Sequence, residues 1–228
     1  MPALVTRFLL LAGVLALSAC AAEDLTRPPE PIGDFRLGYN IVVADKAQTV
    51  GPSRKATPEE WEAVLQAEIA KRLGRYDGEK LYHVGVAVDA YALAVPGIPL
   101  VVSPKSVLAL SVNIFDDTAG VTVNAESKRF TVFERLSGET VVGSGLTQSR
   151  EKQMQNLASN AARQITAWIV ENKAWFTPEA VAARAAAAAA AKAAGTGAPA
   201  PAAAAKAVPA PLPAPVPAPL PAPVPAGN

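Results

Sequence analysis

The C-terminal end of this chain consists almost entirely of alanine and proline, and this composition limits what the rest can fold into. A hydrophobic core needs large apolar side chains, and residues 177–228 supply very few of them. The large apolar side chains that could form a core lie mainly in residues 36–176, a stretch long enough for one domain. The sequence therefore predicts a single globular domain at 36–176, an Ala-rich helix or linker at 177–197 and a Pro/Ala tail at 198–228.

The start of the chain has the pattern of a secretion signal. Arg7 supplies a positive charge, and residues 8–17 form an apolar stretch of about ten residues, which is too short to span a bilayer. The motif Leu17-Ser18-Ala19-Cys20 follows and resembles the bacterial lipobox. This resemblance implies that a signal peptide, residues 1–19, is removed and that Cys20 receives acyl chains such as palmitate, which bind the chain to a membrane.

Cys20 is the only cysteine in the chain, so it has no disulfide partner, and acylation would remove a loose thiol from an oxidising compartment. An ordinary secretory signal with an incidental cysteine is the alternative. In the enterobacterial pattern an Asp after the acylated cysteine favours the inner membrane. In this chain Cys20 is followed by Ala21 and Ala22 instead. The resemblance therefore implies an anchor in the outer membrane on its periplasmic face, with the inner membrane as the alternative.

The first half of the mature chain predicts a tether, a strand and a helix. Residues 20–35 carry charges and prolines without apolar periodicity, which indicates a lipidated tether without fixed structure. A strand is expected at 36–44, with Leu37, Tyr39 and Ile41 on one face and an apolar end typical of deep burial. The motif Thr57-Pro58-Glu59-Glu60 predicts a capped helix start, and apolar residues at helical spacing continue from Trp61 to Leu73.

The second half predicts further strands and a long helix. Apolar and polar residues alternate in 81–93 and 107–115, and strands at 130–135 and 140–142 are joined by a short turn. An amphipathic helix is expected at 148–172. This order predicts an α+β two-layer sandwich, with a mainly antiparallel sheet and two amphipathic helices on one face.

The sequence contains no recognisable catalytic or metal-binding motif. His83 is the only histidine, and no motif identifies partners for a catalytic triad around it. Asp116 and Asp117 are adjacent at a strand end and are best interpreted as turn residues. The 21 basic and 20 acidic residues give a net charge of +1, without a basic patch for nucleic acid. We therefore expect a chain that is not an enzyme and binds no metal, cofactor or nucleic acid.

The connection at 94–104 is unusual because it is apolar almost throughout. Its prolines disfavour a regular central strand, so it either folds back over a core edge or exposes an apolar patch to a partner or a bilayer. In the second case, the candidate contact residues are Val95, Ile98, Leu100, Val101 and Val102.

The C-terminal residues predict a helix followed by a spacer. Thr177-Pro178-Glu179 is a second cap, and residues 180–194 are nearly all alanine, without large side chains to dock them. We therefore expect an exposed helix, and deletion of residues 178–228 should leave the thermal midpoint nearly unchanged. From Pro199 onward prolines alternate, which favours polyproline II and a reach of about 80 Å. Such a tail could contact peptidoglycan or another envelope component.

Residues 17–172 loosely resemble auxiliary lipoproteins of ABC-type envelope transporters. The likeness rests on the lipobox, the order of elements and the segment 131–145, TVFERLSGETVVGSG. It implies a non-enzymatic adaptor or accessory in envelope transport or assembly, with an envelope protein as its partner. A lipid-binding or shuttling module that uses the 94–104 loop is the alternative, and an unrecognised hydrolase is a third.

Replacing Cys20 with Ser should block acylation, because serine is too poor a nucleophile to replace the thiol at that site. Mass spectrometry should find the acyl chains on the N-terminus of the wild-type chain and none on Cys20→Ser. An unlipidated wild-type N-terminus would contradict the lipobox interpretation.

Overall fold

The alternation of apolar side chains in two central strands determines how the domain is layered. The structure is a computed structural model that describes residues 25–95, 106–134 and 148–195. Strand β3 (Leu81–Ala92) pairs antiparallel with β4 (Val107–Asp116). Even-numbered residues of both strands are buried along the paired region, such as Val86 opposite Val112. Both strands were predicted from this alternation, and both are confirmed.

The remaining strands extend this pair into a six-stranded sheet within the described residues. Strand β1 (Arg36–Val43) is parallel to β3, and β6 (Lys128–Phe133) is antiparallel to β4. The short strands β2 (Gln48–Thr49) and β5 (Val121–Thr122) add to β3 and β4. The sheet is therefore mixed, because the helix between β1 and β3 returns the chain in the same direction.

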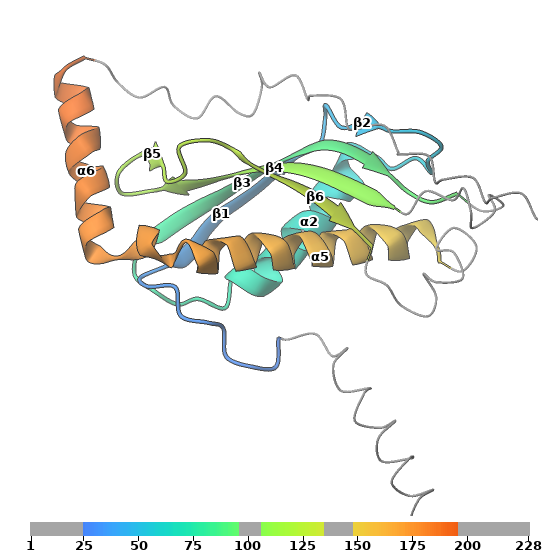
Figure 1. The fold of residues 1–228 in the computed structure, drawn as a ribbon, viewed down its shortest axis with the longest axis horizontal. Helices are drawn as coiled ribbons and strands as arrows, with labels where there is room; N and C mark the ends of the chain where they lie inside the picture. Colours follow the sequence, from blue (N-terminus) through green and yellow to red (C-terminus); the bar gives the residue numbers. More distant parts are fainter. Residues whose placement is uncertain (1–24, 96–105, 135–147, 196–228) are drawn as a thin grey trace, which may run out of the picture.

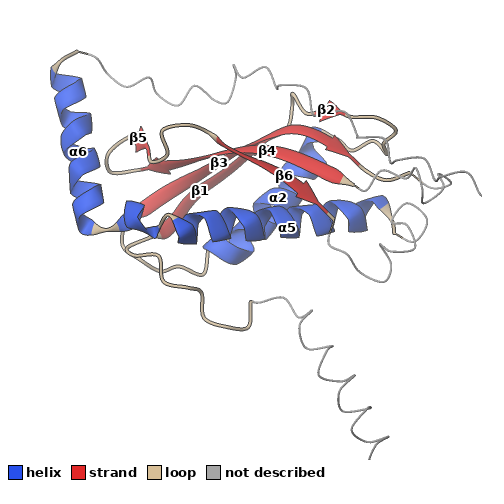
Figure 2. Ribbon diagram, viewed as in Figure 1, coloured by secondary structure: helices blue, strands red, loops and turns tan. Residues whose placement is uncertain are grey.

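Two long helices cover one face of the sheet. Helix α2 (Pro58–Leu73) begins with the predicted capping box between Thr57 and Glu60. Helix α5 (Arg150–Glu171) is capped by the side chain of Ser149. Figure 2 shows both helices together on one side of the strands, and their apolar stripes join a single core cluster with the sheet. The predicted α+β fold, with two amphipathic helices on one face of a sheet, is confirmed.

Strand β1 is present as predicted, but only one of its two faces is buried. Tyr39 is 71% exposed and Ile41 is 54% exposed, whereas Val42 is buried. Val42 lies beside Val86 in the parallel register, so it shares the helix-covered face with the even residues of β3. The predicted deep burial of the apolar strand end holds for Val42 and Ala44 and was wrong for Ile41 and Val43, because periodicity separates two faces without telling which one the helices cover.

The segment before β1 is packed against the domain, so the predicted unstructured tether at 20–35 is wrong for its last residues. Ile32 and Phe35 are fully buried in the core. The ring of Phe35 stacks on Tyr82 at a centroid distance of 5.3 Å and meets Phe176 edge-on. Gly33 permits this contact, since its φ is +101° and a Cβ there would lie 2.9 Å from the carbonyl oxygen of Phe176.

The Ala-rich helix is also attached to the domain. A short 3-10 helix, η2 (Lys173–Phe176), leads into α6 (Pro178–Ala193), which stands across the end of the sheet where β5 lies (Figure 1). Arg184 of α6 binds Asp116 at the end of β4, with Nε and Nη2 lying 3.1 and 2.9 Å from Oδ2. Its Nη1 donates to the carbonyl oxygen of Trp175. Because Asp116 is only 2% exposed, this ion pair attaches α6 to the domain through a buried carboxylate.

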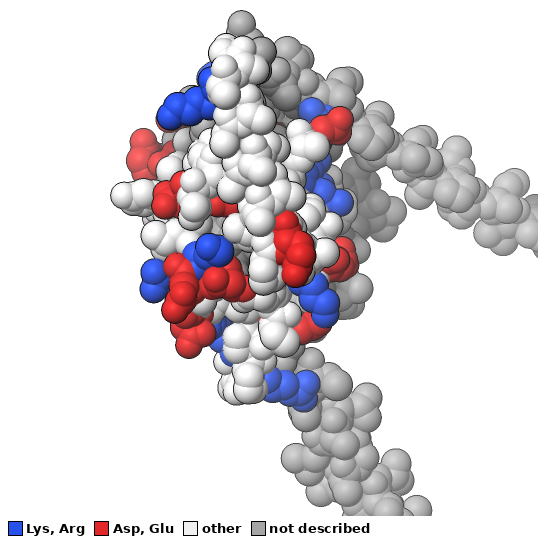
Figure 3. Space-filling model, turned by 90° about the vertical axis from the view of Figure 1, so that its left-hand side faces the viewer, with Lys and Arg blue, Asp and Glu red and all other residues white. Residues whose placement is uncertain are grey.

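One stripe of α6 faces the domain although its side chains are small. Val181 is buried, and Ala185, Ala188 and Ala191 are half-buried at helical spacing. The opposite alanines form an uncharged band between charged side chains at this end of the molecule (Figure 3). The prediction of an undocked helix over 180–194 was wrong because it looked for large apolar side chains, whereas Arg184, Val181 and half-buried alanines supply the contacts. Within the described residues, no helix is long and apolar enough to cross a membrane.

Replacing Arg184 with Met should lower the free energy of unfolding by about 3 kcal/mol, because the Asp116 carboxylate would be left buried without its partner. Lys192→Met, an exposed change on the same helix, should alter stability by about 0.5 kcal/mol or less. Urea denaturation of the two variants makes the comparison. A chain ending at residue 195 should have the same unfolding free energy as the full chain. A chain ending at residue 177 should be destabilised by about as much as the Arg184→Met variant. Equal stability of the two truncated chains would contradict this role of α6.

Candidate functional site

The face of the sheet opposite α2 and α5 is the most extensive candidate for a functional surface. We call it the open face, because no helix of the described residues covers it. Odd-numbered side chains point to it from β1, β3, β4 and β6, in line with the registers of the paired strands. Its members are Tyr39, Ile41, Val43, His83, Gly85, Ala87, Asp89, Val107, Ala109, Ser111, Asn113, Phe115, Arg129, Thr131 and Phe133.

Large apolar side chains on the open face are exposed at both sheet margins. Tyr39, Ile41 and Val43 lie on the β1 side, and Phe133, which is 53% exposed, lies on β6. Between them β4 contributes polar residues such as Ser111 and Asn113, both half-buried. Clustered apolar side chains with polar neighbours are typical of protein interaction surfaces.

Three rings form a row across adjacent strands of the open face. Tyr39 of β1 lies 4.9 Å from His83 of β3, measured between ring centroids. The ring of His83 lies 6.1 Å from that of Phe115 on β4, with an interplanar angle of 17°. We call these three residues the aromatic row. The row lies at the end of the open face next to Asp116, with Tyr39 exposed and its ring tilted by 40° against that of His83.

His83 is fixed in the aromatic row by hydrogen bonds at both ring nitrogens. The backbone N–H of Tyr39 donates to Nδ1 at 2.8 Å, and Nε2 lies 2.9 Å from Oδ1 of Asp117. This pattern assigns the proton to Nε2. Gly38 leaves room for the ring, since a Cβ there would lie 2.5 Å from Nδ1. With both nitrogens engaged, His83 has no free nitrogen to accept a proton from a nucleophile, as the base of a catalytic triad must.

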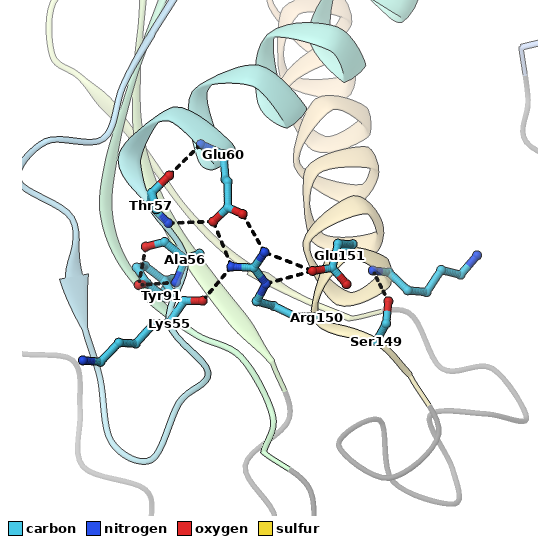
Figure 4. A network of polar contacts seen from close by, with 9 residues as sticks. Lys55, Ala56, Thr57, Glu60, Tyr91, Ser149, Arg150 and Glu151 are labelled. Carbon is cyan, nitrogen blue, oxygen red and sulfur yellow. Dashed lines mark hydrogen bonds and ion pairs between the residues drawn. The ribbon is translucent and has the colours of Figure 1, made fainter.

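A polar network joins the two helix N-termini at the other end of the domain (Figure 4). The guanidinium of Arg150 donates to both carboxylate oxygens of Glu60, at 2.5 and 2.9 Å. It also contacts Glu151 and the carbonyl oxygen of Lys55. Because these partners engage the guanidinium on several sides, the network clamps α2 to α5 rather than offering a charge to a ligand.

A hollow of about 1110 Å³ lies beside the connection between β5 and β6. Its lining includes Trp168 and Trp175, whose rings meet edge-on at 5.3 Å. The amide of Asn124 also lines it, but its oxygen accepts from Ile114 N–H and its nitrogen donates to the carbonyl oxygen of Glu126. Since protein partners satisfy this amide, it is not held ready for a ligand.

The structure describes little of the contact site predicted from sequence. Val95 is half-buried, and the preceding Ala94 is buried, with its N–H bound to Ser106 Oγ and its carbonyl oxygen to Gln153 Nε2. The other predicted contact residues, Ile98, Leu100, Val101 and Val102, lie outside the described residues, as does the lipidation residue Cys20. The described ranges contain no group of three His, Cys, Asp or Glu residues suited to a metal ion.

Sequence reasoning missed the open face although its signal was present. Tyr39 and Ile41 were recognised as one face of a strand, and Ala87 and Ser111 as the weaker faces of two others. Placing β1 beside β3 in parallel register would have united these faces. The predicted helix that starts at Thr57, between the first two predicted strands, was the clue to that parallel pairing.

Comparisons with known proteins concern solved structures alone, because no family model and no curated protein matches the chain. A putative lipoprotein from Caulobacter crescentus is 14% identical with a TM-score of 0.33, covering 57% of this chain and 92% of that chain. A Xanthomonas campestris protein of family DUF330 is 13% identical with a TM-score of 0.36, covering 61% and 91%. A minor lipoprotein from Acinetobacter baumannii is 16% identical with a TM-score of 0.26, covering 60% and 95%. At these values the similarities assign neither a family nor a function.

The helix clamp predicts a pH dependence of stability. The pKa of Glu60 is lowered from its ordinary value of 4.5, first by the Thr57 N–H that donates to it and then by Arg150. Its stabilising contribution is therefore present above pH 4.5 and is lost as the pH falls through the lowered pKa. At pH 6 the wild type should exceed Glu60→Gln by about 0.5–1 kcal/mol in unfolding free energy, since the pair is partly exposed.

Urea titrations between about pH 6 and pH 3 should show this difference shrinking towards the acid end. In an Arg150→Met background, Glu60→Gln should lower the unfolding free energy by less than it does in the wild type, because the partner of Glu60 is already absent. An unchanged cost in that background would contradict the clamp.

Proposed function

We propose that this chain is a lipoprotein of the bacterial envelope, anchored through Cys20 on the periplasmic face of the outer membrane. Its domain acts as a non-enzymatic adaptor that binds an envelope protein through the open face. The anchor rests on the sequence Leu17-Ser18-Ala19-Cys20, and the adaptor role rests on the exposed apolar side chains of the open face.

The exposure of Tyr39, Ile41 and Val43 carries this proposal. Burying such side chains against a partner removes apolar area from water, which favours association, and leaving them exposed gives no such gain. A binding role is favoured over catalysis because His83, the chain's only histidine, has both nitrogens engaged by protein groups. Binding sites for lipid are enclosed and largely apolar, whereas polar residues such as Ser111 and Asn113 interrupt the open face, which favours a protein partner.

A photoreactive residue at position 41 tests the adaptor role in intact cells. Illumination should produce a discrete crosslinked protein, because Ile41 lies on the open face. The same residue at position 167, exposed on the outer side of α5, should produce none. Equal products from both positions, or none from position 41, would contradict partner binding through the open face.

The variant Ile41→Asp should separate folding from binding. Because Ile41 is exposed, the change should alter the unfolding free energy by about 0.5 kcal/mol or less. The charge should also abolish the product formed by a photoreactive residue at position 39, because a buried unpaired carboxylate disfavours the complex. Ala167→Asp is the matched control and should leave that product unchanged. Recovery of bound phospholipid in place of a protein would contradict the adaptor and support a lipid-binding module.

A further inference from the structure

The aromatic row lies at the end of the open face where α6 leaves the domain. Phe115, the last ring of the row, directly precedes Asp116, and Asp116 binds Arg184 of α6. Tyr39 is exposed, and the His83 ring beside it is held by two hydrogen bonds. The row therefore combines an exposed ring on a held neighbour with a position near helix α6, after which the C-terminal tail begins.

Helix α6 carries the chain towards the open face. It begins beside the end of α5 and runs away from that helix, past the end of the sheet (Figure 1). Since α5 lies on the covered side, the far end of α6 points to the opposite side. From Arg184 to Ala193 the helix advances by about 14 Å at 1.5 Å per residue.

We propose that the aromatic row binds the chain's own Pro-rich tail, within residues 199–226, in a polyproline II conformation. Proline rings pack well on aromatic surfaces, and a preformed polyproline II segment loses little entropy on binding. The spacing also fits. Ring-centroid distances of 4.9 and 6.1 Å along the row place Tyr39 and Phe115 within about 11 Å of each other, and residues three apart on one side of a polyproline II helix are separated by about 9.3 Å.

Length and composition of the tail agree with this contact. A segment starting at Pro199 can reach about 80 Å, which far exceeds the width of the row. Lys206 is the only charged residue after α6, and alternating prolines with Ala, Leu and Val make every side of the segment apolar. The contact therefore needs no fixed register. A tethered segment has an effective concentration of about 1 mM, so even a weak site is occupied much of the time.

Paramagnetic NMR on the chain from residue 20 to 228 tests this contact. Cys20→Ser removes the only cysteine, and Ala218→Cys then carries a single nitroxide label. The ring signals of Tyr39 and Phe115 should lose about half of their intensity or more. Phe133 is the internal control, because it lies on the same open face about 27 Å along the strands from Phe115.

In Tyr39→Ala the loss at Phe115 should fall to the level seen at Phe133. Equal losses of signal intensity at Phe115 and Phe133 in the labelled chain that keeps Tyr39 would overturn the proposal. A loss that arises only when labelled chains are mixed with separate isotope-labelled chains would also overturn it, because the tail would then come from another copy. This measurement uses purified chain, so its result is independent of whether an envelope partner is crosslinked in cells.

Discussion

The burial of a single face of the sheet is the constraint on which the rest of the structure depends. Large apolar side chains occupy the even positions of β4, while the odd positions hold residues such as Ser111 and Asn113. Helices can therefore stabilise the domain from one side only. Both long helices pack there, clamped to each other through Glu60 and Arg150, and the other side is left for contacts beyond the core.

Much of the fold could be predicted from sequence because local rules agree with global packing in the central elements. The capping motif at Thr57 and the alternation in β3 and β4 favour the same local structures that the packed domain needs. Predictions failed where one polar contact or one pairing outweighed composition. Alanine alone gave no reason for α6 to dock, yet Arg184 reaches a buried carboxylate. Charges and prolines before residue 36 suggested a tether, yet Ile32 and Phe35 enter the core.

The candidate site was harder to predict because it depends on which strands become neighbours. Tyr39, His83 and Phe115 are far apart in the chain and belong to three different strands. Only the parallel pairing of β1 with β3, together with the antiparallel pairing of β3 with β4, brings their rings into one row. A sequence pattern assigns each side chain to a face of its own strand but does not by itself name the strand that pairs with it.

The packing of Phe35 against Phe176 also determines how the domain would bear mechanical load. These residues stand just inside the two ends of the core, and they meet each other and Tyr82 at one end of the sheet. A force pulling the chain before Ile32 away from α6 would enter through this aromatic cluster and leave through the Arg184–Asp116 pair. Because Tyr82 and Asp116 are partners across β3 and β4, that force would meet the sheet at this one pair, at a single end of the two central strands.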